Sequence, residues 1–219
     1  LRRQRQMCIR DRHAIGDRAN REVLNVYEKL RQNEMKRGDP PSKLRHRIEH
    51  VQLLHMNDYL RLASSQIIAS MQPIHATSDM TLAEKYWGNR ISGAYAWRTQ
   101  IDAGAILAFG SDAPVESINP LWGIHAAVTR SNRTNNVGSI GWQTQQCLTV
   151  DEAVRAYTIG AAYAAYREND LGTLTPGKLA DLVVLDKDIY HCDPMEIHTT
   201  NVLGTMIDGV WKYRASSLY

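Results

Sequence analysis

Short apolar runs, each ending in polar or turn-forming residues, recur along the first half of the chain. A continuous apolar run of this length is typical of a buried parallel strand, with the polar residue at the strand's carboxyl end. The clearest example starts at Gly104 and ends in Gly110, Ser111 and Asp112. Three strands are predicted at 45–52, 66–73 and 104–112, and 13–17 is predicted to be the tail of a strand before them.

Between these runs, apolar residues recur at helical spacing. The first predicted helix covers 18–37, and Asp17 is placed to cap it. Strands that alternate with helices are typical of βα units around a parallel sheet, so the predicted fold class is α/β, and four units make half of a (β/α)8 TIM-like barrel. Further helices are predicted near 57–64, over 81–103 and near 121–130, and the apolar face of the first consists of Ala19, Val23, Leu24, Tyr27 and Leu30.

The end of the chain has a different pattern. Thr149 and Glu152 form a capping box that opens an Ala-rich helix, predicted to reach about Arg167. Turn-rich and apolar stretches then alternate, which favours antiparallel strands. We expect 13–170 to form the half-barrel and 171–219 a small β-rich appendage, with strands at 180–186 and in a pair at 202–213 that is broken at Asp208 and Gly209.

The first twelve residues are basic, and 6–12 resemble the translation of a transposase adaptor sequence used to prepare sequencing libraries. We therefore expect 1–12 to be a non-native segment, loosely packed at Met7 and Ile9. The native part of the chain is expected to begin near His13, with the native sequence upstream of it missing.

Composition narrows the class of protein. The chain has 219 residues, of which 43% are hydrophobic, enough for a sizeable core. The net charge of +3 comes without a basic stripe, so we expect no nucleic-acid partner, and no apolar run is long enough to span a membrane. Three scattered cysteines argue against a disulfide framework and indicate a reducing, cytoplasmic setting.

Four candidate functional residues lie at or just after the carboxyl ends of successive predicted strands: His13, His50, His75 and Asp112. Because the carboxyl ends of parallel barrel strands meet at one mouth, these side chains are expected to converge there. Imidazole and carboxylate groups are ligands of zinc and similar divalent metals. A single histidine is more often packed or solvated, and that is the interpretation for the other histidines, His46, His55, His125, His191 and His198.

Five stretches in this order resemble the C-terminal half of the amidohydrolase superfamily of metal-dependent hydrolases, in the branch that includes N-substituted formamide deformylase. The resemblance covers nearly everything after residue 12, and it implies that the strands are the fifth to eighth of the barrel. The stretches lie at 13–19, 47–52, 70–75, 109–115 and 172–186.

The resemblance also implies roles for individual residues. His13 and His50 would bind one or two divalent metal ions, expected to be zinc. Asp112 would bind metal and act as the general base that accepts a proton from the attacking water. His75 could bind metal or substrate, and it is assigned with Gln72 to a small-molecule amide or formamide substrate whose C–N bond is hydrolysed.

This sequence departs from the family pattern because it contains neither the first nor the fourth barrel strand. The family carries a His-x-His pair on its first barrel strand and often a bridging carboxylated Lys or carboxylate on the fourth. We therefore expect the chain as given to be inactive on its own.

Two alternatives stay open. Residues 46–50 match the H-x-x-E-H pattern of inverted zinc metallopeptidases, which requires a helix there. The chain could also be a non-catalytic fragment, limited to weak metal binding or to homo-oligomers formed through an exposed barrel edge.

Overall fold

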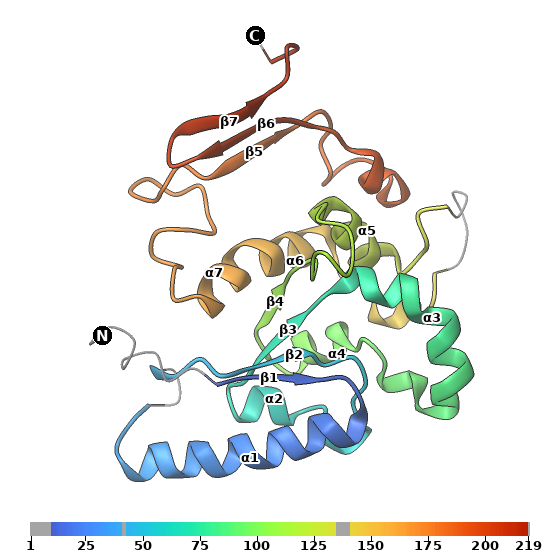
Figure 1. Ribbon diagram of the computed structural model, residues 1–219, viewed down its shortest axis with the longest axis vertical. Helices are drawn as coiled ribbons and strands as arrows, with labels where there is room; N and C mark the ends of the chain where they lie inside the picture. The colour runs from blue at the N-terminus through green and yellow to red at the C-terminus, as the bar shows by residue number, and fades with distance from the viewer. Residues whose placement is uncertain (1–9, 41–42, 135–140, 219) are drawn as a thin grey trace.

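Four parallel strands form the sheet at the centre of the protein (Figure 1). The structure is a computed structural model that describes residues 10–40, 43–134 and 141–218, so the predictions for Met7 and Ile9 lie outside the described residues. The four predicted strands are confirmed in their predicted order, although the first ends at Ala14, before the predicted end at 17, and the other three are shorter than expected. They are β1 (Asp11–Ala14), β2 (Arg47–His50), β3 (Ile68–Met71) and β4 (Leu107–Phe109), and the sheet order is β1-β2-β3-β4.

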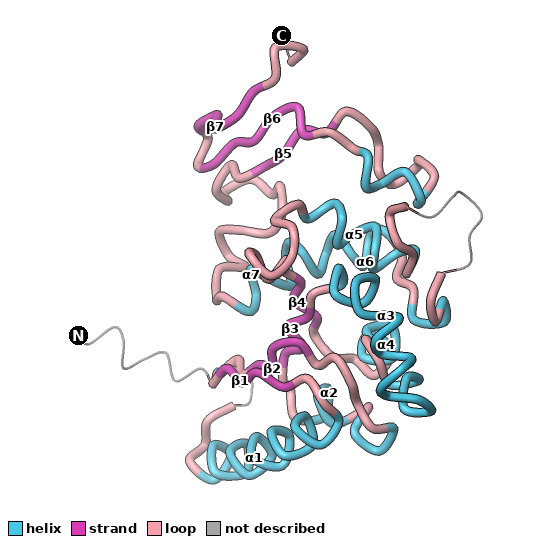
Figure 2. The backbone as a smooth tube through the Cα atoms, turned by 45° about the vertical axis from the view of Figure 1, so that its right-hand side comes forward, coloured by secondary structure: helices cyan, strands magenta, loops and turns pink. Residues whose placement is uncertain are grey.

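Helices connect these strands, which confirms the α/β class. Figure 2 shows α1 and α2 below the sheet and α3 and α4 beside it. The helices are α1 (Asp17–Lys36), α2 (Arg61–Ser64), α3 (Pro73–Trp87), α4 (Trp97–Asp102), α5 (Pro120–Thr129), α6 (Val150–Arg155) and α7 (Ala161–Ala164). Short 3-10 turns are η2 (Met56–Asp58), η3 (Gly88–Gly93), η4 (Thr144–Gln146) and η6 (Pro194–Thr199), and η5 (Ala156–Gly160) is a π-helical turn.

The main hydrophobic core lies on one face of the parallel sheet. Successive side chains of a strand point to opposite faces, so every second residue faces the core. In the pairing register, Ile48 is opposite Ala69, and Ala69 is opposite Leu107; all three are buried in the same cluster. The other face carries polar residues in β1 and β2, where exposed His13 pairs with half-buried Glu49.

Helix α1 confirms the predicted apolar face in part. Leu24 and Tyr27 are buried, but Ala19 is exposed and Asn20 is fully buried in its place. The Asn20 amide donates hydrogen bonds to backbone carbonyls, including that of Leu53 at 3.1 Å, so a polar side chain holds the start of α1 against the loop after β2. The prediction that Asp17 caps α1 is wrong, because Gly16 occupies the N-cap position without a side-chain cap and Asp17 is the first helical residue.

Helix α3 begins at Pro73, eight residues before the predicted start at 81, so the predicted boundary is wrong. Proline suits the first turn of a helix because its missing N–H would have no partner there. The first turn, from Pro73 to Ala76, is buried on all sides. Because this turn has no exposed polar positions, its sequence shows no helical periodicity. His75 therefore lies in the first turn of a helix that follows β3.

The capping box at Thr149 and Glu152 is confirmed. The predicted Ala-rich helix is confirmed from Val150 to Ala164, three residues short of Arg167, and the π-helical turn η5 lies within it between α6 and α7. A Cβ atom on Gly160 would lie only 2.1 Å from the carbonyl oxygen of Leu107. Only glycine permits this close approach between η5 and β4.

The appendage predicted near the end of the chain is a separate antiparallel sheet, far from α1 in Figure 1. It consists of β5 (Leu182–Leu185), β6 (Val202–Ile207) and β7 (Val210–Arg214). The break between β6 and β7 falls at Asp208 and Gly209 as predicted, and both residues have positive φ. Helical turn η6 packs against α5 and connects this sheet to the rest of the protein.

Strand β1 begins two residues before His13. Asp11 and Arg12 pair with Arg47 and Ile48, and the backbone carbonyl of Arg10 accepts a hydrogen bond from Arg47 N–H at 3.1 Å. The origin of 1–12 stays a prediction. Among the described residues, no helix is both long and apolar enough to cross a membrane.

Candidate metal centre

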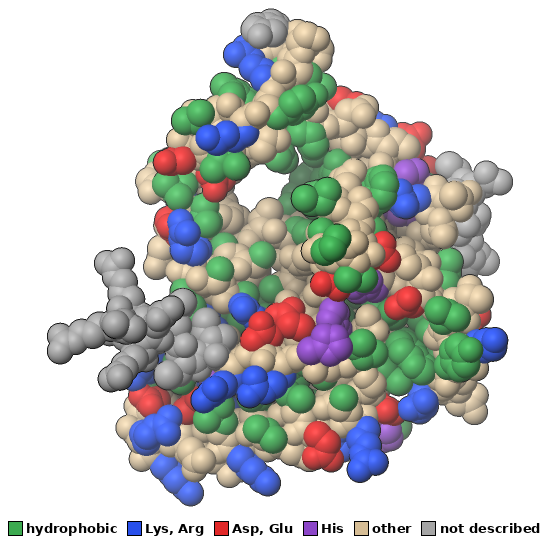
Figure 3. All heavy atoms as spheres, viewed as in Figure 1, with side chains coloured by type: hydrophobic (Ala, Val, Ile, Leu, Met, Phe, Trp, Pro, Cys, Tyr) green, Lys and Arg blue, Asp and Glu red, His purple; other side chains and the backbone are tan. Residues whose placement is uncertain are grey.

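Three side chains converge beyond the carboxyl ends of β2, β3 and β4. His50, His75 and Asp112 each offer one ligand atom, and these atoms all lie within 4.8 Å of one another. His50 ends β2, His75 lies in the first turn of α3, and Asp112 lies in the loop after β4. Histidine and acidic side chains also gather at the middle of the face seen in Figure 3.

The backbone at this cluster is strained. His50, Val51 and Asp112 have φ values of 77°, 47° and 56°, in the left-handed region that side chains other than glycine rarely adopt. Strict alternation along β2 would place His50 on the core face with Ile48. Instead, the His50 ring contacts the ring of His13, with their centroids 4.4 Å apart. Residues held in this region cost about 1–3 kcal/mol each and cluster at functional sites.

Hydrogen bonds hold the cluster together. His75 Nε2 lies 3.1 Å from Asp112 Oδ2, and His50 Nδ1 lies 2.8 Å from Gln72 Oε1. His75 and Gln72 are buried, while the Asp112 side chain is 35% exposed. The carboxylate is thus accessible from the open mouth, whereas the imidazole beside it is packed into the protein.

His13 lies at the edge of this group. Its ring contacts His50, but His13 is exposed and is not among the three mutually close residues. Burial, followed by the neighbouring His13, lowers the pKa of His50. A lowered pKa keeps an imidazole neutral near pH 7, which is the form that binds metals. The metal role predicted for His13, His50 and Asp112 stays a prediction.

The donor set fits a divalent metal. Two imidazoles and one carboxylate are the ligand types of catalytic zinc, with a further position left for water. Ligand atoms around tetrahedral zinc, at its usual bond lengths, are about 3.3 Å apart. The observed limit of 4.8 Å is therefore within reach of small side-chain rotations.

The sequence interpretation missed Glu116. Its Oε1 lies 3.7 Å from His75 Nδ1, on the opposite side of the imidazole from Asp112. A carboxylate behind a metal-binding histidine commonly orients the ring. The available signal was an acidic residue four positions after Asp112, in the same loop after the strand.

The metallopeptidase alternative is wrong for residues 46–50, because 47–50 form strand β2 and not a helix. His46 is fully buried, and its Nε2 lies 2.9 Å from Glu34 Oε1, whereas His50 contacts Gln72. The two histidines therefore have separate partners and do not form one metal site.

The other histidines without an assigned role are packed or solvated. His125 is fully buried, with its ring against that of His198 at 4.8 Å between centroids. His55 caps η2 and His191 pairs with Asp188, and both histidines are exposed.

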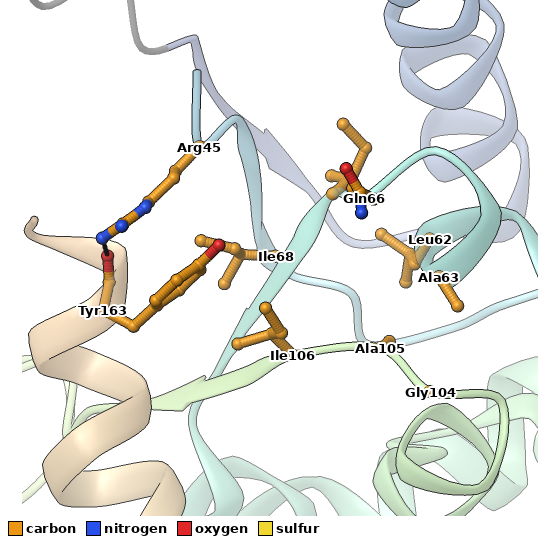
Figure 4. Close-up of a pocket in the computed structure, with 10 residues that line it drawn as sticks. Arg45, Leu62, Ala63, Gln66, Ile68, Gly104, Ala105, Ile106 and Tyr163 are labelled. Carbon is orange, nitrogen blue, oxygen red and sulfur yellow. Dashed lines mark hydrogen bonds between the residues drawn. The ribbon is translucent and has the colours of Figure 1, made fainter. Parts of the chain in front are cut away.

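A cavity of about 120 Å³ lies at the other end of the parallel sheet. Its lining includes Ile68 at the start of β3, Ile106 just before β4, and Tyr163 on α7 (Figure 4). The Arg45 guanidinium crosses this end and donates to the carbonyl of Tyr163. None of the three candidate ligands lines this cavity, so it is distinct from the metal centre.

The fold and the site define an α/β protein with a candidate divalent-metal centre at the carboxyl ends of its parallel strands. The chain belongs to the amidohydrolase family, whose sequence profile matches residues 6–213. This finding confirms the family inferred from the five sequence stretches.

Individual relatives agree with this family. The protein named amidohydrolase YtcJ of Bacillus subtilis is 36% identical over 206 residues, which cover 93% of this chain and 37% of the relative. The N-substituted formamide deformylase of Arthrobacter pascens is 29% identical over 203 residues, covering 92% of this chain and 36% of the relative.

A similar solved structure is that of an uncharacterized metal-dependent hydrolase from Pyrococcus horikoshii. It aligns with a TM-score of 0.68 and 26% identity over 84% of this chain and 35% of its own. The chain therefore spans little more than a third of the length of these relatives.

Proposed function

We propose that this chain supplies the C-terminal half of a (β/α)8 barrel, strands five to eight, in a metal-dependent hydrolase. The enzyme would cleave a carbon–nitrogen bond of a small molecule with water. The observation that carries the proposal is the convergence of His50, His75 and Asp112, whose ligand atoms lie within 4.8 Å beyond the ends of consecutive parallel strands. Membership of the amidohydrolase family supports this reaction class.

In this proposal His50 and Asp112 hold a divalent metal ion, which we take to be zinc, and His13, whose ring contacts that of His50, is the third ligand, while His75 contacts Asp112. When bound, the metal would supply the Lewis acidity that lets water ionise near neutral pH. The partly exposed Asp112 carboxylate would accept the proton from water and return it to the departing amine. The 3.1 Å contact between His75 Nε2 and Asp112 Oδ2 would hold this carboxylate in place.

The proposed substrate is a small amide or formamide. The similarity to a relative named N-substituted formamide deformylase supports this choice. Gln72 contacts His50 and His75 contacts Asp112, and both Gln72 and His75 would contact the substrate. Cys147 and Cys192 are free thiols, which is compatible with the cytoplasmic location we propose.

We further propose that the isolated chain has no turnover. Its candidate centre has two or three histidines and one carboxylate, without the His-x-His pair and bridging ligand of the family pattern. Strands β1 and β4 form the two edges of the parallel sheet, and unpaired edges favour self-association. A fragment that only binds metal weakly or self-associates is therefore the alternative outcome.

The test is a hydrolase assay after reconstitution with zinc, using a panel of N-acyl and N-formyl amines. Two proteins are compared: the 219-residue chain and a longer polypeptide that also carries the upstream barrel strands. We expect turnover by the longer protein and none above background by the chain. Robust turnover by the chain would contradict its proposed inactivity, and an inactive longer protein that binds zinc would contradict the proposed reaction.

A further inference from the structure

Gln72 contacts both histidines of the candidate metal centre through different atoms. Its side-chain Oε1 lies 2.8 Å from His50 Nδ1, and its backbone carbonyl accepts a hydrogen bond of 3.1 Å from the backbone N–H of His75. Gln72 is only 8% exposed, so water competes little for these contacts. One buried residue thus joins the end of β2 to the first turn of α3.

The contact with Oε1 determines which nitrogen of His50 carries hydrogen. An amide oxygen only accepts hydrogen bonds, so Nδ1 must be the donor in this pair. A neutral imidazole has one N–H, and Nε2 then keeps its lone pair. Among the described residues, no hydrogen bond engages His50 Nε2.

We propose that Gln72 is a positioning residue that holds His50 in the Nδ1–H tautomer and leaves Nε2 free to bind metal. This inference rests on the proposed function, in which His50 is a metal ligand. It assigns to Gln72 a role beyond substrate contact.

The local backbone explains why Gln72 is available for this role. Gln72 occupies the N-cap position of α3, but its side chain makes no capping hydrogen bond, and Pro73 behind it has no N–H. The side-chain oxygen is therefore not needed by the helix. At the other partner of this contact, His50 has a positive φ, and its ring lies next to that of His13 and not on the core face of the sheet.

The amide group of Gln72 also has a free end. No described residue accepts a hydrogen bond from its Nε2, so this group can donate to a substrate oxygen while Oε1 holds His50. Positioning and substrate contact are therefore compatible in one side chain.

The experiment measures histidine tautomers in the metal-free chain by two-bond ¹H–¹⁵N correlation spectra above pH 7. His46 provides an internal reference of the opposite kind. Its Nδ1 accepts from Arg10 N–H at 2.9 Å and its Nε2 faces Glu34, so it must be the Nε2–H tautomer. We expect His50 as Nδ1–H in the wild type and in Gln72→Glu, which keeps an acceptor oxygen, but not in Gln72→Met.

Zinc titration of the same three proteins provides the second measurement. Loss of an outer hydrogen-bond partner typically weakens metal binding by roughly 10- to 100-fold. We expect this loss in Gln72→Met and recovery in Gln72→Glu, while the His46 signals stay unchanged in both.

The two measurements separate this inference from the proposed function. A wild-type His50 in the Nε2–H tautomer would overturn the positioning role, and so would an unchanged tautomer in Gln72→Met. If the tautomers behave as expected but the wild-type chain binds no zinc, the tautomer control by Gln72 is supported and the proposed metal function fails. The wild-type spectrum alone is decisive if Gln72→Met does not fold.

Discussion

Two histidines four residues apart, His46 and His50, have opposite environments. His46 is fully buried and uses both ring nitrogens within the protein: Nδ1 accepts from Arg10 N–H, and Nε2 lies 2.9 Å from Glu34 Oε1. The Tyr27 ring stacks on it at 5.4 Å between centroids. Every polar atom of this imidazole is satisfied, so nothing is left for a ligand.

His50 is half-buried and uses only Nδ1 within the described protein, through Gln72. It also lies on strained backbone, whereas His46 is not among the residues of positive φ. A structural histidine thus fills both of its hydrogen-bonding positions, and a candidate ligand keeps one free. Position along the predicted strand separated these two histidines in the sequence, and their hydrogen bonds show the physical difference between them.

The largest expected effect is on turnover, at the His50 side of the comparison. Asp112→Asn keeps the shape of the side chain but removes the proton acceptor, and general acid–base catalysis contributes roughly 10²- to 10⁴-fold. We expect at least this loss in kcat for the longer, zinc-loaded protein. The matched control is His55→Ala, which removes an exposed imidazole and should keep wild-type turnover. Equal activity of Asp112→Asn and wild type would exclude Asp112 as the base.

The next effect is on stability, at the His46 side. The Glu34 side chain is 1% exposed and pairs with His46 and with Arg31 Nη1 at 2.8 Å. Removing one partner from a buried ion pair costs about 3–5 kcal/mol, because the remaining charge is unpaired. Glu34→Ala should therefore lower the urea-derived free energy of unfolding by this amount. Exposed Glu22 lies on the same helix, and Glu22→Ala should change it by less than about 0.5 kcal/mol.

Acid should weaken the protein through its buried histidines. Burial lowers the pKa of His46, and it lowers the pKa of His125 to about 4 from an ordinary value of 6.5. A lowered folded-state pKa means that the unfolded state binds more protons below pH 6.5, so stability is full above that pH and falls as the pH approaches 4.

For His125 alone this loss is roughly 2 kcal/mol by pH 5. The measurement is the free energy of unfolding between pH 7.5 and 5 for the wild type and for His191→Gln, which changes an exposed histidine. Both proteins should lose stability equally. A flat profile would show that these imidazoles are not held neutral by burial.

The smallest expected effect is on the free energy of unfolding, at the Tyr27 hydroxyl beside His46. Tyr27 OH lies 2.8 Å from the carbonyl oxygen of Arg10 and 3.0 Å from that of Arg47. Tyr27→Phe keeps the ring that stacks on His46 and removes the hydroxyl, which should cost about 1 kcal/mol of unfolding free energy. Zinc affinity should not change, and a weaker zinc affinity would mean that the two histidine environments are coupled.

The strand order and the positions of the candidate residues at or after the strand ends could be predicted from the sequence, because a buried strand and the polar residues that end it are consecutive. Other features depend on distant partners. Asn20 is buried because carbonyls such as that of Leu53 accept from its amide, and no local pattern encodes that contact. The contact of Gln72 with His50 joins residues 22 positions apart and accompanies a left-handed backbone that the sequence does not indicate.

The central claim is that His50 and Asp112 are ligands of a metal centre. Equilibrium zinc binding to the 219-residue chain tests this claim most directly. Calorimetric titration should show one site in the wild type, lost in His50→Ala and in Asp112→Ala. The site should be retained in His55→Ala and His191→Ala, which each remove an exposed histidine elsewhere. Zinc binding that survives the first two substitutions, or a folded wild-type chain that binds no zinc, would contradict the account.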